Sequence, residues 1–355
     1  MTGRSDPPFF GDGSTLNRRQ RSFRMAIWVV SLVLTMFSGF VAGGIVSNWQ
    51  RDGGRTKARE LADEGATDAA IATYQRYLLQ LPDDSATRLE FAQYLQRKNP
   101  LEALREFRQI PPSAAEFTTA ARAVAGLSMN LERDYDAIAP LEFLEAMFPD
   151  EAGIQQALAE IHFRQREFDK SLEHARRFRT LKPDSVEACL LIAESSDSLG
   201  QTDAMIEPLE WALHLNPEIP QAHLNLAFAL QSAGRSEDAF PHVRWFVDRF
   251  PSSVAGHRIL AMVERSRDHD DEALAAAQKA SELGPGNLEC AILVADMLLY
   301  RRRYQEAYDK LEKLAIDWPR EPRVLTPLLR AAVFCRKSER IQELQTLLRK
   351  IERKE

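Results

Sequence analysis

A large aliphatic residue followed by alanine recurs every 34 residues along most of the chain. When each unit is numbered from 1 to 34 and one unit runs from residue 220 to 253, position 7 is Val124, Leu158, Ile192, Leu226, Leu260 and Val294, and position 8 is Ala125, Ala159, Ala193, Ala227, Ala261 and Ala295. Position 20 is small in most units, being Ala137, Ser171, Met205, Ala239, Ala273 and Ala307. Small residues at positions 8 and 20 predict that two helices of each unit pack closely, and a fixed period of this length predicts a solenoid.

Proline and glycine divide each unit into two helices. Position 32 is Pro149, Pro183, Pro217, Pro251, Pro285 and Pro319. Proline lacks an amide hydrogen and disfavours helix at the residue before it, so it ends the second helix. Position 15 is glycine at Gly200 and Gly234 and polar elsewhere, which suits the left-handed residue that ends a first helix.

This pattern resembles the tetratricopeptide repeat, a helix-turn-helix of 34 residues with small residues at positions 8 and 20 and proline at 32. The tryptophan usual at position 4 is absent, since that position is Gln155, Cys189, His223, His257 and Ala291. The resemblance covers the chain from about residue 51 to its end and is strongest from Thr118 to Glu321. It implies an all-α fold, a right-handed superhelix of stacked helix pairs.

The chain divides into a tail, an apolar stretch, a linker and the array. Residues 1–24 are rich in Gly, Pro, Ser and charge and predict a flexible basic tail, residues 25–48 an apolar helix and residues 49–56 a linker. The array, residues 57–355, starts with a partial unit. An irregular unit follows at 85–117, then regular units at 118–321 and a C-terminal cap at 322–355.

The apolar stretch predicts a membrane anchor. No charged residue lies between Met25 and Gln50, and the helix from Met25 to Val46 would be about 33 Å long, enough for a hydrocarbon core of about 30 Å. The alternative is a secretory signal peptide, but the apolar run is longer than such peptides use. We expect a retained single-pass helix with its N-terminus in the cytoplasm, because arginines cluster before it. The array then lies outside the cytoplasm, in the periplasm if the source is bacterial.

Small residues recur every four positions within the apolar stretch, at Gly39, Gly43 and Ser47. They would lie on one helix face, where a second membrane helix packs closely. Self-association through this face is one hypothesis. The alternative is that glycine is common in membrane helices.

The net charge and the motifs in the sequence limit which classes of function are expected. The net charge is -6, and the first 50 residues carry five arginines and two aspartates, which leaves -9 for residues 51–355. An acidic array does not suit nucleic acid. The three cysteines have no disulfide or zinc spacing, and no catalytic motif occurs. We therefore expect no enzyme activity, no cofactor and no metal site, and we interpret the acidic run at 268–272 as a solvated turn rather than a calcium loop.

The resemblance implies a binding surface formed by positions 2, 5, 9, 12 and 13 of the first helices. The candidate residues for a peptide-binding groove are Glu160, Phe163, Arg164, Glu194, Asp197, Leu224, Phe228, Gln231, Arg258, Met262, Arg265, Ile292, Asp296 and Tyr300. Apolar residues lie in the central units, with acids toward one end and arginines toward the other. Such a surface suits an extended or helical peptide, in which apolar anchors provide affinity and charges set the register. The alternative is an ordinary mixed surface.

The function expected from these patterns is a membrane-anchored protein-interaction scaffold. The alternative is a cell-envelope assembly or export component, in which the array chaperones polysaccharide export or the maturation of a cofactor-containing enzyme. On the second helices, Trp211 and Trp245 share position 26. One interpretation is that they form an outer aromatic ridge for a second partner. The other is that they cover the seam between units, because an aromatic residue at helical spacing more often serves packing.

Overall fold

The computed structural model describes residues 53–353, and every regular element within that range is helical. The chain folds as two compact units that meet between Leu131 and Glu132. This architecture confirms the predicted all-α solenoid. No helix among residues 53–353 is long and apolar enough to cross a membrane. The expected anchor at residues 25–48, with Gly39, Gly43 and Ser47, lies outside the described residues.

The first compact unit contains a helix over residues 53–63 and four further helices. These are α2 (Thr67–Gln80), α3 (Ser85–Gln96), α4 (Pro100–Arg108) and α5 (Phe117–Asn130). Aromatic side chains fill its core: Tyr74 stacks on Phe91 with ring centroids 5.1 Å apart, and Phe107 is 1% exposed. Helix α4 has only 9 residues and ends before Pro111, so its pair with α3 is shorter than the pairs that follow.

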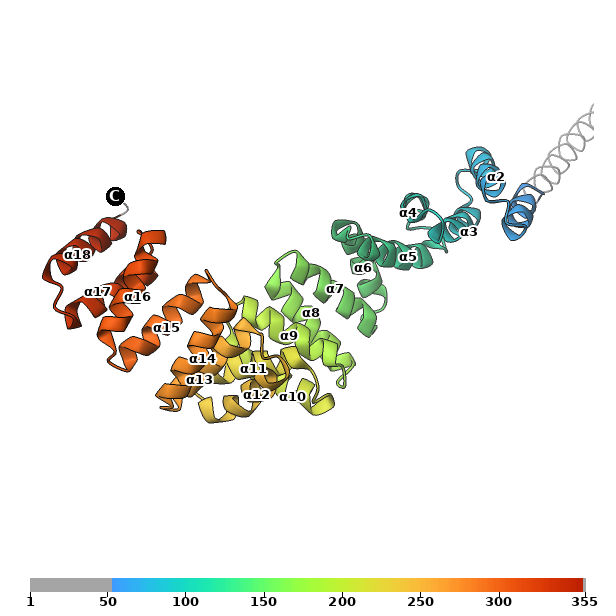
Figure 1. Ribbon diagram of the computed structural model, residues 1–355. Helices are drawn as coiled ribbons and strands as arrows, with labels where there is room; N and C mark the ends of the chain where they lie inside the picture. Colours follow the sequence, from blue (N-terminus) through green and yellow to red (C-terminus); the bar gives the residue numbers. More distant parts are fainter. Residues whose placement is uncertain (1–52, 354–355) are drawn as a thin grey trace, which may run out of the picture. The chain divides into compact units, whose positions relative to one another are not determined.

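The second compact unit consists of alternating first and second helices laid side by side (Figure 1). Its first helices are α7 (Ala152–Arg164), α9 (Val186–Ser198), α11 (Pro220–Ser232), α13 (Val254–Ser266), α15 (Leu288–Tyr300) and α17 (Pro322–Phe334). Its second helices are α6 (Asp134–Met147), α8 (Phe168–Leu181), α10 (Ile206–Leu215), α12 (Ser236–Arg249), α14 (Asp270–Leu283), α16 (Tyr304–Asp317) and α18 (Ser338–Glu352). Each of these first helices starts 34 residues after the one before, which is the period of the sequence pattern.

Every first helix from α5 to α17 is followed by a left-handed residue at position 15. Gly200 and Gly234 have φ of 70° and 76°, and the polar residues there have φ between 55° and 62°, at Glu132, Arg166, Asp268, Arg302 and Arg336. In the unit of α11, Gly234 N–H donates to Gln231 O at 3.0 Å and Arg235 N–H donates to Leu230 O at 2.8 Å. This pair of bonds is a Schellman motif, which satisfies carbonyls left free at the helix end.

Alanine lets the two helices of a unit come together. Ala227 on α11 and Ala239 on α12 are both 0% exposed. The unit of α9 departs from this rule, because Met205 occupies position 20 and is itself 1% exposed. The second helix of that unit begins with a 3-10 turn, η1 (Thr202–Met205), before α10. The larger side chain occupies the space at the helix contact, and the first turn adopts a different geometry.

Candidate binding surfaces

The first helices contact one another in two groups, α7 with α9 and α11 to α17. We name the residues at positions 2, 5, 9, 12 and 13 of α7 to α17 the first-helix face. Within it, α7 contacts α9, and α11, α13, α15 and α17 contact one another in sequence. Neighbouring first helices therefore bring residues of the same position close together, although these residues are 34 apart in the sequence.

Two of the four apolar residues expected on this face are available to a ligand. Phe228 on α11 and Met262 on α13 share position 9 and are partly exposed. Leu224 and Ile292, at position 5, are instead only 8% and 9% exposed. They contribute to packing and not to an apolar floor, because position 5 is turned closer to the core than position 9.

The acidic end of the face carries carboxylates with few partners. Glu160 on α7 accepts a hydrogen bond from Gln156 at 2.9 Å. Glu194 on α9 is half-buried, and neither its carboxylate nor that of the exposed Asp197 has a hydrogen bond or ion pair among the described residues. Burial raises the pKa of Glu194, and no neighbouring group opposes that shift.

Several arginines expected to provide free positive charge are paired within the protein. Arg164 donates to Asp134 at 2.8 Å. Arg258 and Arg323 both approach Glu289, at 3.3 Å and 2.8 Å. The pKa of Glu289 is lowered, first by its hydrogen bond from Arg323. These side chains are less available to a partner than the sequence suggested.

A row of three charges crosses the other end of the face. Asp296 on α15 lies between Arg265 on α13 and Arg330 on α17, and none of the three has a side-chain hydrogen bond among residues 53–353. Burial raises the pKa of Asp296, and the two guanidinium groups oppose this shift. The row has a net charge of one positive unit, so this end can accept an anion or an acidic side chain.

The remaining candidates lie at the margins. The Phe163 ring packs edge-on against Phe168 with centroids 5.5 Å apart, and Gln231 is partly exposed. Tyr300 is 51% exposed and its hydroxyl donates to Asp268 Oδ1 at 3.4 Å. These residues share the face with Phe228 and Met262, but the structure does not gather all the candidates into one compact pocket.

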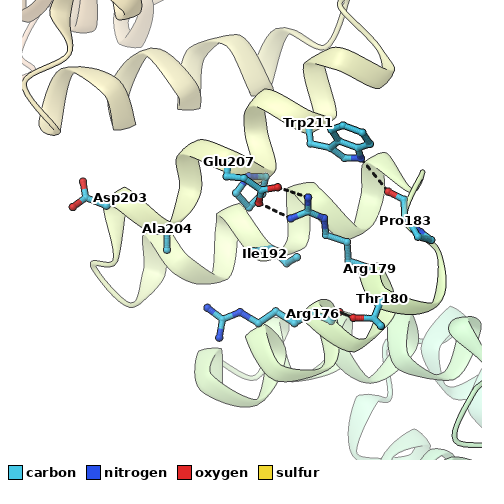
Figure 2. A pocket seen from close by; sticks show the side chains of 10 residues that line it. Arg176, Arg179, Thr180, Pro183, Ile192, Asp203, Ala204, Glu207 and Trp211 are labelled. Atoms are coloured by element: carbon cyan, nitrogen blue, oxygen red, sulfur yellow. Dashed lines mark hydrogen bonds and ion pairs between the residues drawn. The ribbon is translucent and has the colours of Figure 1, made fainter.

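A second surface, which the sequence did not predict, lies between α8 and α10 (Figure 2). It is a cavity of about 630 Å³, bounded by Arg176 and Arg179 on α8, Ile192 on α9, Asp203 in η1 and Trp211 on α10. Figure 2 shows Arg179 reaching across to Glu207, with Nη1 2.6 Å from Oε2. The Arg176 guanidinium and the Asp203 carboxylate have no partner among the described residues. The cavity therefore contains one ion pair, between Arg179 and Glu207, and two charged side chains without a partner among the described residues.

The two tryptophans at position 26 have different surroundings. Trp245 lies between His223, with ring centroids 3.9 Å apart, and the Arg249 guanidinium, 3.9 Å from its centroid. Trp211 is 37% exposed and its indole N–H donates to Pro183 O at 3.1 Å. Trp245 therefore packs within its own unit, against α11 and along α12, whereas Trp211 lines the cavity.

The histidines have structural partners. His223 bonds through Nδ1 to His242 at 3.0 Å and through Nε2 to Pro217 O at 2.9 Å. His257 makes the equivalent bond to Pro251 O at 2.9 Å. Residues 53–353 contain no group of three or more metal-binding side chains. Within the acidic run, Asp268 is the left-handed residue before α14, and its neighbours form the first turn of that helix.

Part of the chain matches a known repeat family. Residues 227–287 match the family model described as tetratricopeptide repeat. The crystal structure of the MamA protein is similar at 18% identity and TM-score 0.44, over 48% of this chain and 93% of that one. MamA from Desulfovibrio magneticus RS-1 is similar at 15% identity and TM-score 0.44, over 46% of this chain and 92% of that one.

The structure of YrrB, titled a TPR protein with an unusual peptide-binding site, is similar at 16% identity and TM-score 0.46, over 52% of this chain and 96% of that one. No curated protein sequence matches the chain. The helices, the period and the family match together identify the array as tetratricopeptide repeats.

Proposed function

We propose that this tetratricopeptide-repeat array is a protein-interaction scaffold that binds a peptide or protein segment on the first-helix face. One observation carries the proposal. Phe228 and Met262 lie at the same position of two contacting helices, α11 and α13, and both are partly exposed. A pair of adjacent apolar side chains within a charged surface is the arrangement that provides anchor contacts in interfaces.

The charged groups around this pair favour a peptide over a small molecule. They are spread over helices from α7 to α17, so a ligand must extend across several units to reach them. Peptides that lie in a helical groove use apolar anchors for affinity and charges for orientation.

We further propose that the scaffold is tethered to a membrane through residues 25–48 and displays the array outside the cytoplasm. This part rests on the apolar run and on the arginines that precede it. Protease digestion of sealed membrane vesicles of known orientation tests it. In inside-out vesicles the array should be protected from the protease, because the face of the membrane outside the cytoplasm is enclosed. Digestion of the array in these vesicles would reverse the proposed orientation.

The double substitution Phe228→Ala with Met262→Ala tests the binding surface. It should weaken capture of the partner at least tenfold, because truncating an interface anchor typically costs more than about 1 kcal/mol. Far-ultraviolet circular dichroism should remain helical, since both side chains are partly exposed. The control is Leu79→Ala with Ile316→Ala, which removes two exposed apolar side chains on α2 and α16, away from the first-helix face. Unaltered capture by the first variant would move the site to another surface. A ligand that proves to be polysaccharide alone would favour the envelope export function.

A further inference from the structure

Glu194 is a partly exposed carboxylate that has no side-chain partner among the described residues. It is half-buried on α9, and no donor or cation contacts it among the described residues. Its oxygens are not among the buried side-chain atoms without a partner, so solvent and a ligand group can both reach them. Because the side chain is partly buried, a cation bound to it is screened less by water than at a fully exposed carboxylate.

The surroundings of Glu194 favour a positively charged ligand group. Asp197 lies one turn further along α9, and Glu160 occupies position 9 of the neighbouring helix α7. On the other side in sequence, α11 presents uncharged residues, with Phe228 at position 9 and Gln231 at position 12. The one nearby arginine of this face, Arg164, is already paired with Asp134.

We infer that the segment bound at the α7 to α11 end of the first-helix face carries a lysine or arginine next to an apolar residue. The basic side chain lies between Glu194 and Asp197, and the apolar side chain packs on Phe228. This inference rests on the proposed function and names the chemistry of its ligand. The charge complementarity is specific to this end, because the row of Arg265, Asp296 and Arg330 at the other end has the opposite net sign.

An array of synthetic peptides tests the inference directly. The full-length chain, purified in mild detergent, is applied to spotted peptides in which two adjacent positions carry basic, acidic or apolar residues in every combination. The expected result is retention by peptides that pair Lys or Arg with Leu or Phe. Preference for acidic-apolar peptides, or equal retention regardless of charge, overturns the inference.

Substitutions then assign the contact. Glu194→Gln should weaken binding of the best basic peptide about tenfold, an effect between those of exposed and fully buried charge pairs. Asp197→Asn, on the same helix and exposed, should weaken it several-fold. The control Glu272→Gln removes the same charge from an exposed site on α14 and should leave the affinity unchanged. Equal effects of all three variants would indicate that the net negative charge of the array attracts the peptide, and this would overturn the assigned contact.

The pH dependence of affinity distinguishes a direct contact from a structural role. A cation binds the ionised carboxylate, so affinity should fall as the pH is lowered through the range where Glu194 titrates, which burial places above its ordinary value of 4.5. In Glu194→Gln this fall should move to lower pH, and an unmoved profile counts against the contact. If the basic preference fails but Phe228→Ala with Met262→Ala still weakens peptide binding, the scaffold function stands and only the ligand chemistry is wrong.

Discussion

Exchanging residues at position 15 tests how the first helices end. Gly234 has a φ of 76° and nothing within 4 Å of where a Cβ would be, so alanine there is strained by its backbone alone. The left-handed conformation costs about 1–2 kcal/mol for a residue with a Cβ, and the stiffer unfolded chain returns about 0.4–1 kcal/mol. Gly234→Ala should therefore lower the unfolding free energy by about 0.5–1.5 kcal/mol.

The reverse exchange at an equivalent position should have the opposite sign. Arg166 has a φ of 62°, is exposed and has no side-chain partner among the described residues. Replacing it with glycine removes the same strain, so Arg166→Gly should raise the unfolding free energy by about 0.5–1.5 kcal/mol. In a unit of this size each kcal/mol shifts the melting temperature by about 2–4 °C.

Thermal and urea unfolding followed by far-ultraviolet circular dichroism measure both variants. The control is Gly153→Ala, which lies in α7, has open space around its Cβ position and should stabilise by about 0.5–1 kcal/mol. The reasoning is refuted if Gly234→Ala stabilises as Gly153→Ala does, because then the conformation at position 15 carries no strain.

Three further predictions concern packing and pH. Ala227→Leu should cost about 1–3 kcal/mol by overpacking the contact with Ala239, both 0% exposed, whereas Ala275→Leu on the exposed side of α14 should change little in urea unfolding. Gly256→Ala should destabilise, since its Cβ would lie 2.9 Å from the Phe246 ring, and Gly126→Ala, with open space, should stabilise in the same assay. Burial lowers the pKa of His174 and of His242, so the native state binds fewer protons than the unfolded chain at acidic pH. The unfolding free energy should therefore be highest above about pH 6.5, the ordinary histidine pKa, and fall as the pH drops below it. His242→Gln should reduce this fall in urea midpoints measured against pH, and exposed His214→Gln should not; an equal slope in both variants would contradict the assignment.

The repeating architecture was readable from the sequence because each rule is local. A proline at position 32 ends a helix by its own geometry, and position 15 must turn through a left-handed residue in every unit. The alanines at position 8 and the small residues at position 20 report the contact between two helices of one unit, which are near neighbours in the chain. The membrane anchor, its orientation and self-association through Gly39, Gly43 and Ser47 stay predictions, since residues 25–48 lie outside those described.

The candidate site was only partly readable. Periodicity placed Phe228, Met262 and Glu194 on the first-helix face, but it could not tell that Leu224 and Ile292 are buried or that Arg258 and Arg323 meet at Glu289. Those outcomes depend on how far apart neighbouring helices lie and how long side chains reach between them, which no single unit encodes. The cavity beside Trp211 likewise appears only when α8 and α10 pack, although Met205 at a normally small position was a visible signal. The sequence by itself determined the helices and their period, whereas the tertiary structure decided which charges remain free, because pairing and burial are properties of contacts between units.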